Sequence, residues 1–133
     1  SSDACKLRLS AKLNDAKLTE GEVTEARVSV SNAADETAKM PVAIIGVPGG
    51  LEVRHDQLKE LRDAGTIAAY EVIGRDVVLY WRELAAGKTV ELPLSLVAAV
   101  PGRYTAPASR AYEYYNDEHK RWQAPLAVKI EPR

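Results

Sequence analysis

The sequence predicts an all-β protein, an antiparallel β-sandwich that carries one short α-helix. Stretches in which apolar and polar residues alternate recur at intervals of roughly 10 to 15 residues, as expected for strands with one buried face. Clusters of Gly, Asn, Asp and Ser separate these stretches. Only one stretch has helical spacing. Because 133 residues are the size of one ordinary domain, we expect residues 1–133 to form a single domain.

Three strands are predicted before residue 48. Residues 7–13 alternate Leu and Ala with charged and polar residues, and residues 26–31 repeat this pattern with Ala and Val. The polar stretch "NDAKLTEGE" between them predicts a turn. Residues 42–47, "VAIIGV", are continuously apolar, which indicates a more central strand that ends at the Pro-Gly-Gly of residues 48–50.

One α-helix is predicted, from Asp56 to Ala64. Asp56 is a candidate N-cap, and Gly65 stands where a helix commonly ends in a left-handed residue. Leu58 and Leu61 lie three residues apart, on one face of such a helix. We therefore expect both leucines to dock the helix on the sandwich.

The next strands follow the helix. Residues 67–73 and 76–84 predict a hairpin, because Gly74 and Arg75 stand between them. Residues 90–96 show the cleanest alternation in the chain. Pro93 on the polar face of that stretch indicates an edge position or a bulge, since proline lacks the N–H of a ladder.

A short cluster of charges, Asp117, Glu118 and His119, interrupts the last part of the chain. It is either a catalytic or metal site framed by aromatic residues or the turn between the last two strands. His119 and His55 are the only histidines, and neither has a third ligand at metal spacing. Because alternation stops at Asn116 and resumes only at Leu126, we favour the turn.

Four aromatic residues surround that cluster, namely Tyr112, Tyr114, Tyr115 and Trp122. Tyr and Trp are favoured at binding surfaces, so these residues could form a ligand platform. Aromatic residues on adjacent strands are more often cross-strand packing pairs. Since the chain has no Phe, we expect the core to use them.

Composition and motifs predict no enzyme, cofactor or metal. Eighteen Lys and Arg balance nineteen Asp and Glu for a net charge of -1, without the basic patch of a nucleic-acid-binding protein. No apolar run is long enough to span a bilayer, and the start "SSDACKL" has no signal-peptide core. The Gly-rich "GVPGG" lacks the spacing and the Lys of a phosphate loop, and no serine stands in a nucleophile elbow.

Five segments together resemble the C-terminal receptor-binding domain of the alpha-2-macroglobulin family, which includes complement thioester proteins and bacterial macroglobulins. They are "VAIIGV", "GGLEVRHDQLKELRDAG", "YEV", "VVLYWREL" and "YTAPASRAYEYYN". The resemblance covers about residues 40–125, in order and with compatible spacing. It implies a β-sandwich with one helix at the end of a much larger extracellular or periplasmic chain, which can be membrane-anchored.

The resemblance also implies what the parent chain does. Members of the family trap proteases through a conformational collapse, and some carry a thioester that attaches to the attacker. Cys5 is followed by Lys6-Leu7-Arg8 and not by the Gly-Glu-Gln of a thioester motif. We therefore expect a non-catalytic terminal module, whose partners are the other domains of its parent and, through the parent, a target protease. The alternative is a generic cell-surface β-sandwich that binds a carbohydrate or a protein through its aromatic strand.

The resemblance implies one candidate partner-binding site, at His55 and Lys59. In vertebrate members, two lysines four residues apart on the helix contact a scavenger receptor. The second falls on Lys59, whereas His55 replaces the first, so one fixed ammonium charge is lost. The vertebrate disulfide is also absent, because Cys5 is the single cysteine and Leu126 stands in the region of its partner. These differences favour a bacterial macroglobulin-like protein.

Overall fold

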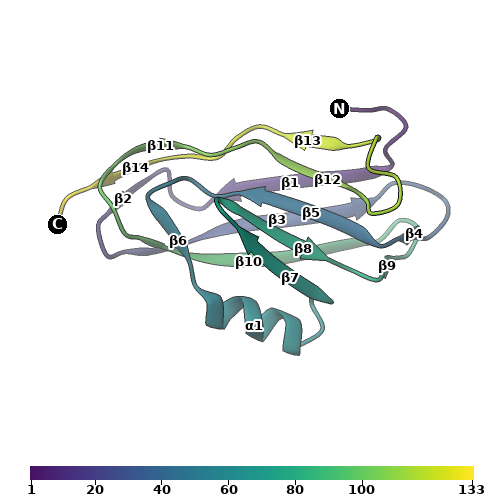
Figure 1. Ribbon diagram of the computed structural model, residues 1–133, viewed down its shortest axis with the longest axis horizontal. Coiled ribbons are helices and arrows are strands. Elements are labelled where there is room, and N and C mark those ends of the chain that lie inside the picture. Colours follow the sequence, from purple (N-terminus) through teal and green to yellow (C-terminus); the bar gives the residue numbers. More distant parts are fainter.

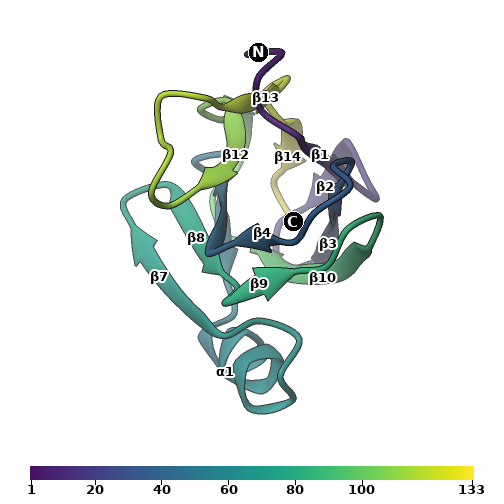
Figure 2. The same ribbon diagram turned by 90° about the vertical axis from the view of Figure 1, so that its right-hand side faces the viewer.

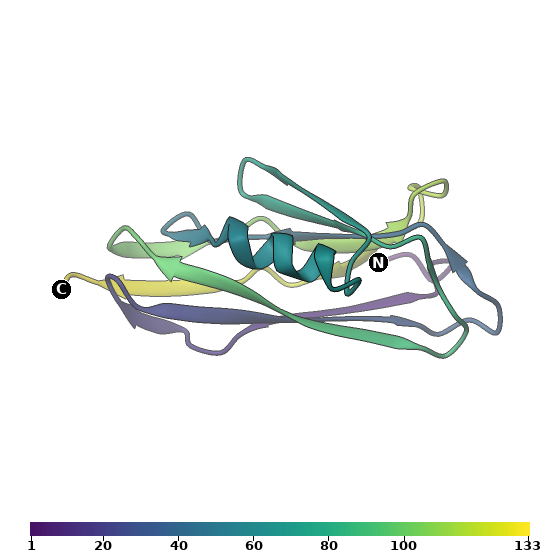
Figure 3. The same ribbon diagram turned by 90° about the horizontal axis from the view of Figure 1, so that it is seen from below.

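The computed structural model describes all 133 residues, and two layers of β-strands with one helix at their side form the molecule (Figures 1 and 3). In chain order the elements are β1 (Leu7–Leu13), β2 (Lys17–Thr19), β3 (Val23–Asn32), β4 (Ala38–Lys39), β5 (Pro41–Gly46), β6 (Leu51–Val53), α1 (His55–Asp63), β7 (Ala69–Ile73), β8 (Asp76–Tyr80), β9 (Glu83–Leu84), β10 (Thr89–Ala98), β11 (Gly102–Thr105), β12 (Ser109–Glu113), β13 (Arg121–Gln123) and β14 (Ala127–Glu131). The predicted fold class is confirmed.

The first layer is an antiparallel sheet in the order β1-β3-β10-β6. Strand β3 is its centre, because it pairs along its length with both β1 and β10. Leu9 and Leu92 lie on the inner face and flank Val30 and Val28 of β3, while Ser and charged residues alternate on the outer face. The period-two pattern of these three strands is thus explained by one buried and one exposed face.

The second layer contains a five-stranded sheet, β13-β12-β5-β8-β7, and a three-stranded sheet, β11-β14-β2. All six residues of β5 are buried, which confirms that this apolar stretch is central. Strand β14 pairs antiparallel with β11 and parallel with β2. Strand β2 therefore carries the chain from the first layer across to the second.

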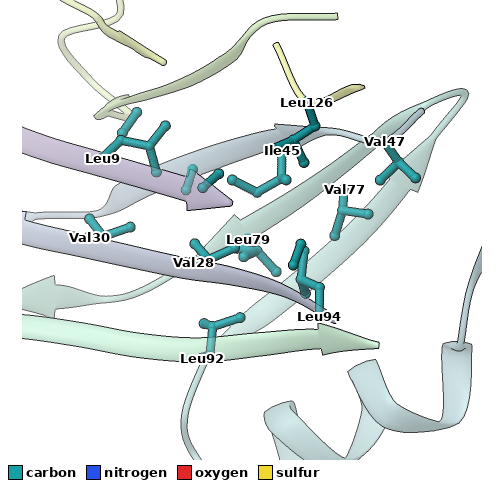
Figure 4. Close-up of a cluster of buried hydrophobic side chains, with 14 of the residues drawn as sticks. Leu9, Val28, Val30, Ile45, Val47, Val77, Leu79, Leu92, Leu94 and Leu126 are labelled. Atoms are coloured by element: carbon teal, nitrogen blue, oxygen red, sulfur yellow. The ribbon is translucent and has the colours of Figure 1, made fainter. Parts of the chain in front are cut away.

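The core lies between the layers and holds 28 buried residues. Figure 4 shows side chains from the two layers pointing toward one another, among them Val28 and Leu94 of the first layer and Ile45 and Leu79 of the second. Trp81 is the one aromatic residue among the buried core residues. Its indole Nε1 donates to the carbonyl oxygen of Thr66 at 2.8 Å. The core is thus mainly aliphatic, in keeping with a chain that has no Phe.

Helix α1 begins one residue earlier than the sequence predicts, so the prediction that Asp56 is the N-cap is wrong. Arg54 is the N-cap, with an extended backbone and no side-chain capping hydrogen bond. Asp56 lies instead in the first turn, where a carboxylate is favoured by the helix dipole.

The C-terminal end of α1 confirms the role predicted for Gly65. Its φ is 80°, a left-handed conformation that glycine adopts at little cost. The Gly65 N–H donates to the Arg62 carbonyl, and the Thr66 N–H donates to the Leu61 carbonyl, both at 3.0 Å. These two bonds form a Schellman motif, which pairs carbonyls that the helix itself leaves free.

The helix covers an open edge of β10. Strand β6 pairs with β10 only from Leu96 onward, so Pro93 lies where β10 has no strand on that side. Gln57 replaces the missing strand, because its Nε2 donates to the Pro93 carbonyl at 2.7 Å and its Oε1 accepts from the Ser95 N–H at 3.1 Å. The predicted edge position of Pro93 is confirmed, and the helix protects that edge from other pairing.

The sequence missed the shortest strands. The turn predicted at "NDAKLTEGE" contains β2, and the strand predicted over residues 76–84 is divided into β8 and β9. The prediction that strand structure resumes only at Leu126 is also wrong, because β13 lies before it and pairs with β12. Strands of two or three residues show too few alternations to be detected.

Candidate functional site

The helix places His55 and Lys59 as the sequence predicts. They lie four residues apart on α1, on adjacent turns, and both are exposed. Neither takes part in any of the four ion pairs of the structure. The two side chains are therefore free to contact a partner.

The charged cluster near the end of the chain lies in a turn between β12 and β13, as predicted. Asp117 and Glu118 are exposed, and the Nε2 of His119 is 3.8 Å from the Glu118 Oε1. No group of three or more His, Cys, Asp or Glu side chains in the structure could hold a metal ion. The segment connects β12 to β13.

That turn holds the N-terminal segment. The Ser2 Oγ and the His119 Nδ1 are 3.1 Å apart, and the Ser2 N–H donates to the Lys120 carbonyl at 3.0 Å. Arg121 adds two bonds, because its Nε donates to the Leu7 carbonyl and its guanidinium Nη2 donates to the Cys5 carbonyl. Backbone groups and Arg121 carry most of this contact.

Substituting Asp117, Glu118 and His119 together by Ser should therefore change the melting temperature by less than about 3 °C, as is usual for surface positions. Of the three side chains, only that of His119 bonds to a distant segment, through one hydrogen bond to Ser2. Thermal unfolding of the triple variant beside the unaltered chain measures the effect. A loss of 10 °C or more would show that the turn organises the sandwich.

Three of the four aromatic residues next to the turn do not enter the core, so for them the prediction that they pack there is wrong. The exposed fractions are 47% for Trp122, 51% for Tyr114 and 82% for Tyr115. Tyr114 and Tyr115 contact each other edge to face, with ring centroids 5.1 Å apart. The cross-strand neighbour of Trp122 is Arg110, not an aromatic residue. These rings are available to a partner.

A second, smaller apolar cluster underlies this surface, on the outer face of the five-stranded sheet. Val42, Ile44 and Val78 form it, and Tyr80 and Tyr112 pack against it. Burial, followed by the hydrogen bond that it donates to Glu71, raises the pKa of Tyr80. Burial also raises the pKa of Tyr112. Both hydroxyls therefore stay protonated at neutral pH and can donate hydrogen bonds.

Charged groups border this aromatic face, which we define by Val42, Ile44, Val78, Tyr80, Tyr112, Tyr114 and Trp122. Two cations lie over its rings: the Arg110 guanidinium is 5.5 Å from the Trp122 ring centroid, and the Lys120 Nζ is 5.3 Å from that of Tyr112. Glu71, on β7 at the far side of the sheet, accepts from the Tyr80 hydroxyl at 3.2 Å. The face thus has an apolar centre with a basic side and an acidic side.

The Gly-rich segment 46–50, which begins at the last residue of β5, packs closely against its neighbours. A side chain at Gly46 would collide with the backbone carbonyl of Pro107, and one at Gly50 would collide with the Tyr104 ring. The Gly46 N–H also donates to the buried Ser109 Oγ at 3.1 Å. The Gly-rich turn that the sequence predicts lies at residues 49 and 50, and the segment contacts β11 and the residues at and just before the start of β12.

The structure is thus a β-sandwich that presents an exposed helix ridge and an aromatic sheet face. The family model of the A-macroglobulin receptor binding domain matches residues 36–124. The chain therefore belongs to the A-macroglobulin receptor-binding-domain family. A search of the curated proteins finds no significant match to this chain.

Solved structures of bacterial alpha-2-macroglobulins share the fold. The Salmonella protein reacted with methylamine is 17% identical, with a TM-score of 0.77 over 99% of this chain and 9% of that chain. The trypsin-activated protein of Escherichia coli is 15% identical, with a TM-score of 0.78 over 96% of this chain and 10% of that chain. A native E. coli fragment from domain MG7 to the C-terminus gives 14% identity and a TM-score of 0.75 over 99% and 24%. The chain spans about a tenth of the length of the two longer chains.

Proposed function

We propose that this chain is a non-catalytic interaction module of a larger alpha-2-macroglobulin-like protein that traps proteases. One observation carries the proposal: nearly the whole chain superimposes on about a tenth of bacterial macroglobulins. Two of the E. coli structures are described as activated by trypsin and by porcine elastase. A protease is therefore the target that we propose for the parent chain, with defence at the cell surface or in the periplasm as its purpose.

The proposed location is extracellular or periplasmic, with anchoring to a membrane through the parent chain as an option. The similar structures come from bacteria that have a periplasm, which supports this location. None of the chain's helices has the length and apolar character that crossing a membrane requires.

The test uses the full-length parent protein and trypsin. A trapped protease should lose activity against a large protein substrate while still cleaving a small peptide, because only the peptide can diffuse into a closed trap. Deleting the region of residues 1–133 from the parent should reduce the protection of the protein substrate. A parent that leaves both trypsin activities unchanged, or a gene that encodes only these residues, would overturn the proposal.

The aromatic face is the surface that we propose for contact with the other domains of the parent chain. Its apolar centre and exposed rings support this role, since exposed apolar patches mark interaction sites. Carbohydrate binding through the same rings is the second candidate, favoured by the exposure of Tyr114 and Trp122. Replacing both by Ser separates the two: loss of glycan binding by the isolated chain favours the carbohydrate, and loss of protection only in the parent favours the domain contact.

We propose that His55 and Lys59 form a receptor contact that is weaker than the contact made by the two lysines of the vertebrate members. An imidazole has neither the reach nor the three donors of an ammonium group. We expect weak binding to an acidic, calcium-caged lipoprotein-receptor module at neutral pH, and a gain of at least about tenfold for a His55→Lys variant. Surface plasmon resonance with the isolated chain measures this difference.

The matched control is Lys59→Ala in the His55→Lys background, which should remove the gain because both charges are needed. Tight binding by the unaltered chain at pH 7 would contradict the expected weak site and would favour receptor clearance as the function.

A further inference from the structure

The outer face of the first layer has a hollow that none of the contacts described above uses. It lies over β1 and β3, has a volume of about 420 Å³, and is lined by Ser10, Lys12, Asn14, Arg27, Ser29 and Glu91 among others. Such a volume lies within the range of small-molecule sites. Strand β3 pairs with β1 on one side and with β10, which carries Glu91, on the other.

The polar side chains around the hollow are not used by the protein itself. The four ion pairs of the structure join other residues, so Lys12 and Arg27 have no carboxylate partner. The nearby hydroxyls of Ser31 on β3 and Thr89 on β10 bond to each other at 2.8 Å. The hydroxyls of Ser10 and Ser29, in contrast, make no side-chain hydrogen bond. The hollow thus presents a set of free donors.

The two cations also face each other. Lys12 and Arg27 are directly opposite in the antiparallel pairing of β1 with β3, and Ser10 is likewise opposite Ser29. Like charges at directly opposed positions destabilise a sheet. Glu91, which pairs with Ser29 from the other side, is the one carboxylate among the lining residues. An anion between Lys12 and Arg27 would relieve the repulsion between them.

We propose that this hollow binds a small molecule, about the size of a sugar, that bears an oxyanion group such as a phosphate, a sulphate or a carboxylate. The Lys12 ammonium and the Arg27 guanidinium would hold the anionic group by charge-assisted hydrogen bonds. The Ser10 and Ser29 hydroxyls and the Asn14 amide can donate to its remaining oxygens. Complementarity of charge identifies the ligand class, because two cations and three neutral donor groups face a single carboxylate. The site lies on the other layer from the aromatic face, so it can act independently of the proposed module contacts.

The test is an NMR titration of the ¹⁵N-labelled chain with inorganic sulphate, glucose 6-phosphate, galacturonate and neutral glucose at millimolar concentrations. Saturable shifts are expected at the amides of residues 10–14 and 27–29 for the anions and not for glucose. Comparison of glucose 6-phosphate with galacturonate distinguishes phosphate from carboxylate as the preferred group. Lys12→Ala and Arg27→Ala should each weaken binding at least about tenfold, and Glu91→Gln should tighten it because a repelling charge is removed.

Two variants separate binding from folding. Lys12→Glu turns the opposed cations into an opposite-charge pair, so it should abolish binding while leaving the melting temperature equal or higher. Lys39→Ala removes an exposed cation elsewhere and should bind like the unaltered chain. The proposal is overturned if no anion gives saturable shifts at these amides, or if Lys12→Glu binds the anions as well as the unaltered chain does.

Discussion

Replacing Leu58 by Ala should lower the free energy of unfolding by about 3 kcal/mol, as expected for a fully buried leucine. Leu58 is 1% exposed and is the one buried residue of α1, so the helix loses its main apolar contact with the sandwich. Urea unfolding, followed by circular dichroism, gives the difference. The loss should also loosen the bonds of Gln57 to β10, since the helix holds that side chain in place.

Leu61→Ala is the matched control for this prediction. Leu61 packs against the core but is only partly buried, so we expect a loss of roughly half that of Leu58→Ala. The sequence placed the two leucines on one docking face without distinguishing them, and the structure does distinguish them. Equal losses for the two variants would show that the helix sits deeper on the sandwich than described.

Gly46→Ala should destabilise the protein by about 3 kcal/mol, the upper part of the usual range for overpacking. The added methyl group would meet the Pro107 carbonyl oxygen, which belongs to the backbone and cannot rotate away. Relief requires β5 to move from the segment before β12, which also weakens the hydrogen bond from the Gly46 N–H to the Ser109 hydroxyl. The midpoint of urea unfolding measures the effect.

Gly87→Ala provides the comparison for Gly46→Ala. Gly87 has a φ of 72° and no atom within 4 Å of an added Cβ, so only the left-handed backbone is strained. We expect about 1 kcal/mol for that strain. If Gly46→Ala were no more costly than Gly87→Ala, the close approach of β5 to Pro107 would not be a determinant of stability.

The long strands were predictable because one face of each packs on the core. Strands β1, β3 and β10 alternate over seven or ten residues, which is enough for the period to stand out. The continuous apolar run of β5 likewise indicated burial on both faces. The helix was predictable from Gly65, but its first residue was not, because Arg54 caps it without any side-chain hydrogen bond.

The candidate sites were harder to predict than the strands. Alternation in "SRAYEYY" shows which residues share a face, but it does not show whether another layer covers that face. Tyr112 and Tyr114 share the outer face of the sheet, where only side chains cover the cluster of Val42 and Val78. The opposition of Lys12 and Arg27 depends on the register between β1 and β3. Nine residues separate β1 from β3, and the register between the two strands could not be read from either strand alone.

The parallel pairing of β2 with β14 contributes to the resistance of the domain to mechanical tension, together with the pairing of β1 with β3. The C-terminus lies at one end of the long axis, and the N-terminus lies toward the other (Figures 1 and 3); Figure 2 looks along this axis. Pulling the two ends apart draws β1 and β2 in one direction and β14 in the other, so the bonds between β2 and β14 are stretched together along the strand axis. Bonds sheared in this way break together and resist more force than bonds peeled apart one at a time. A module attached by its two ends would therefore transmit a pull to its neighbours before it unfolds.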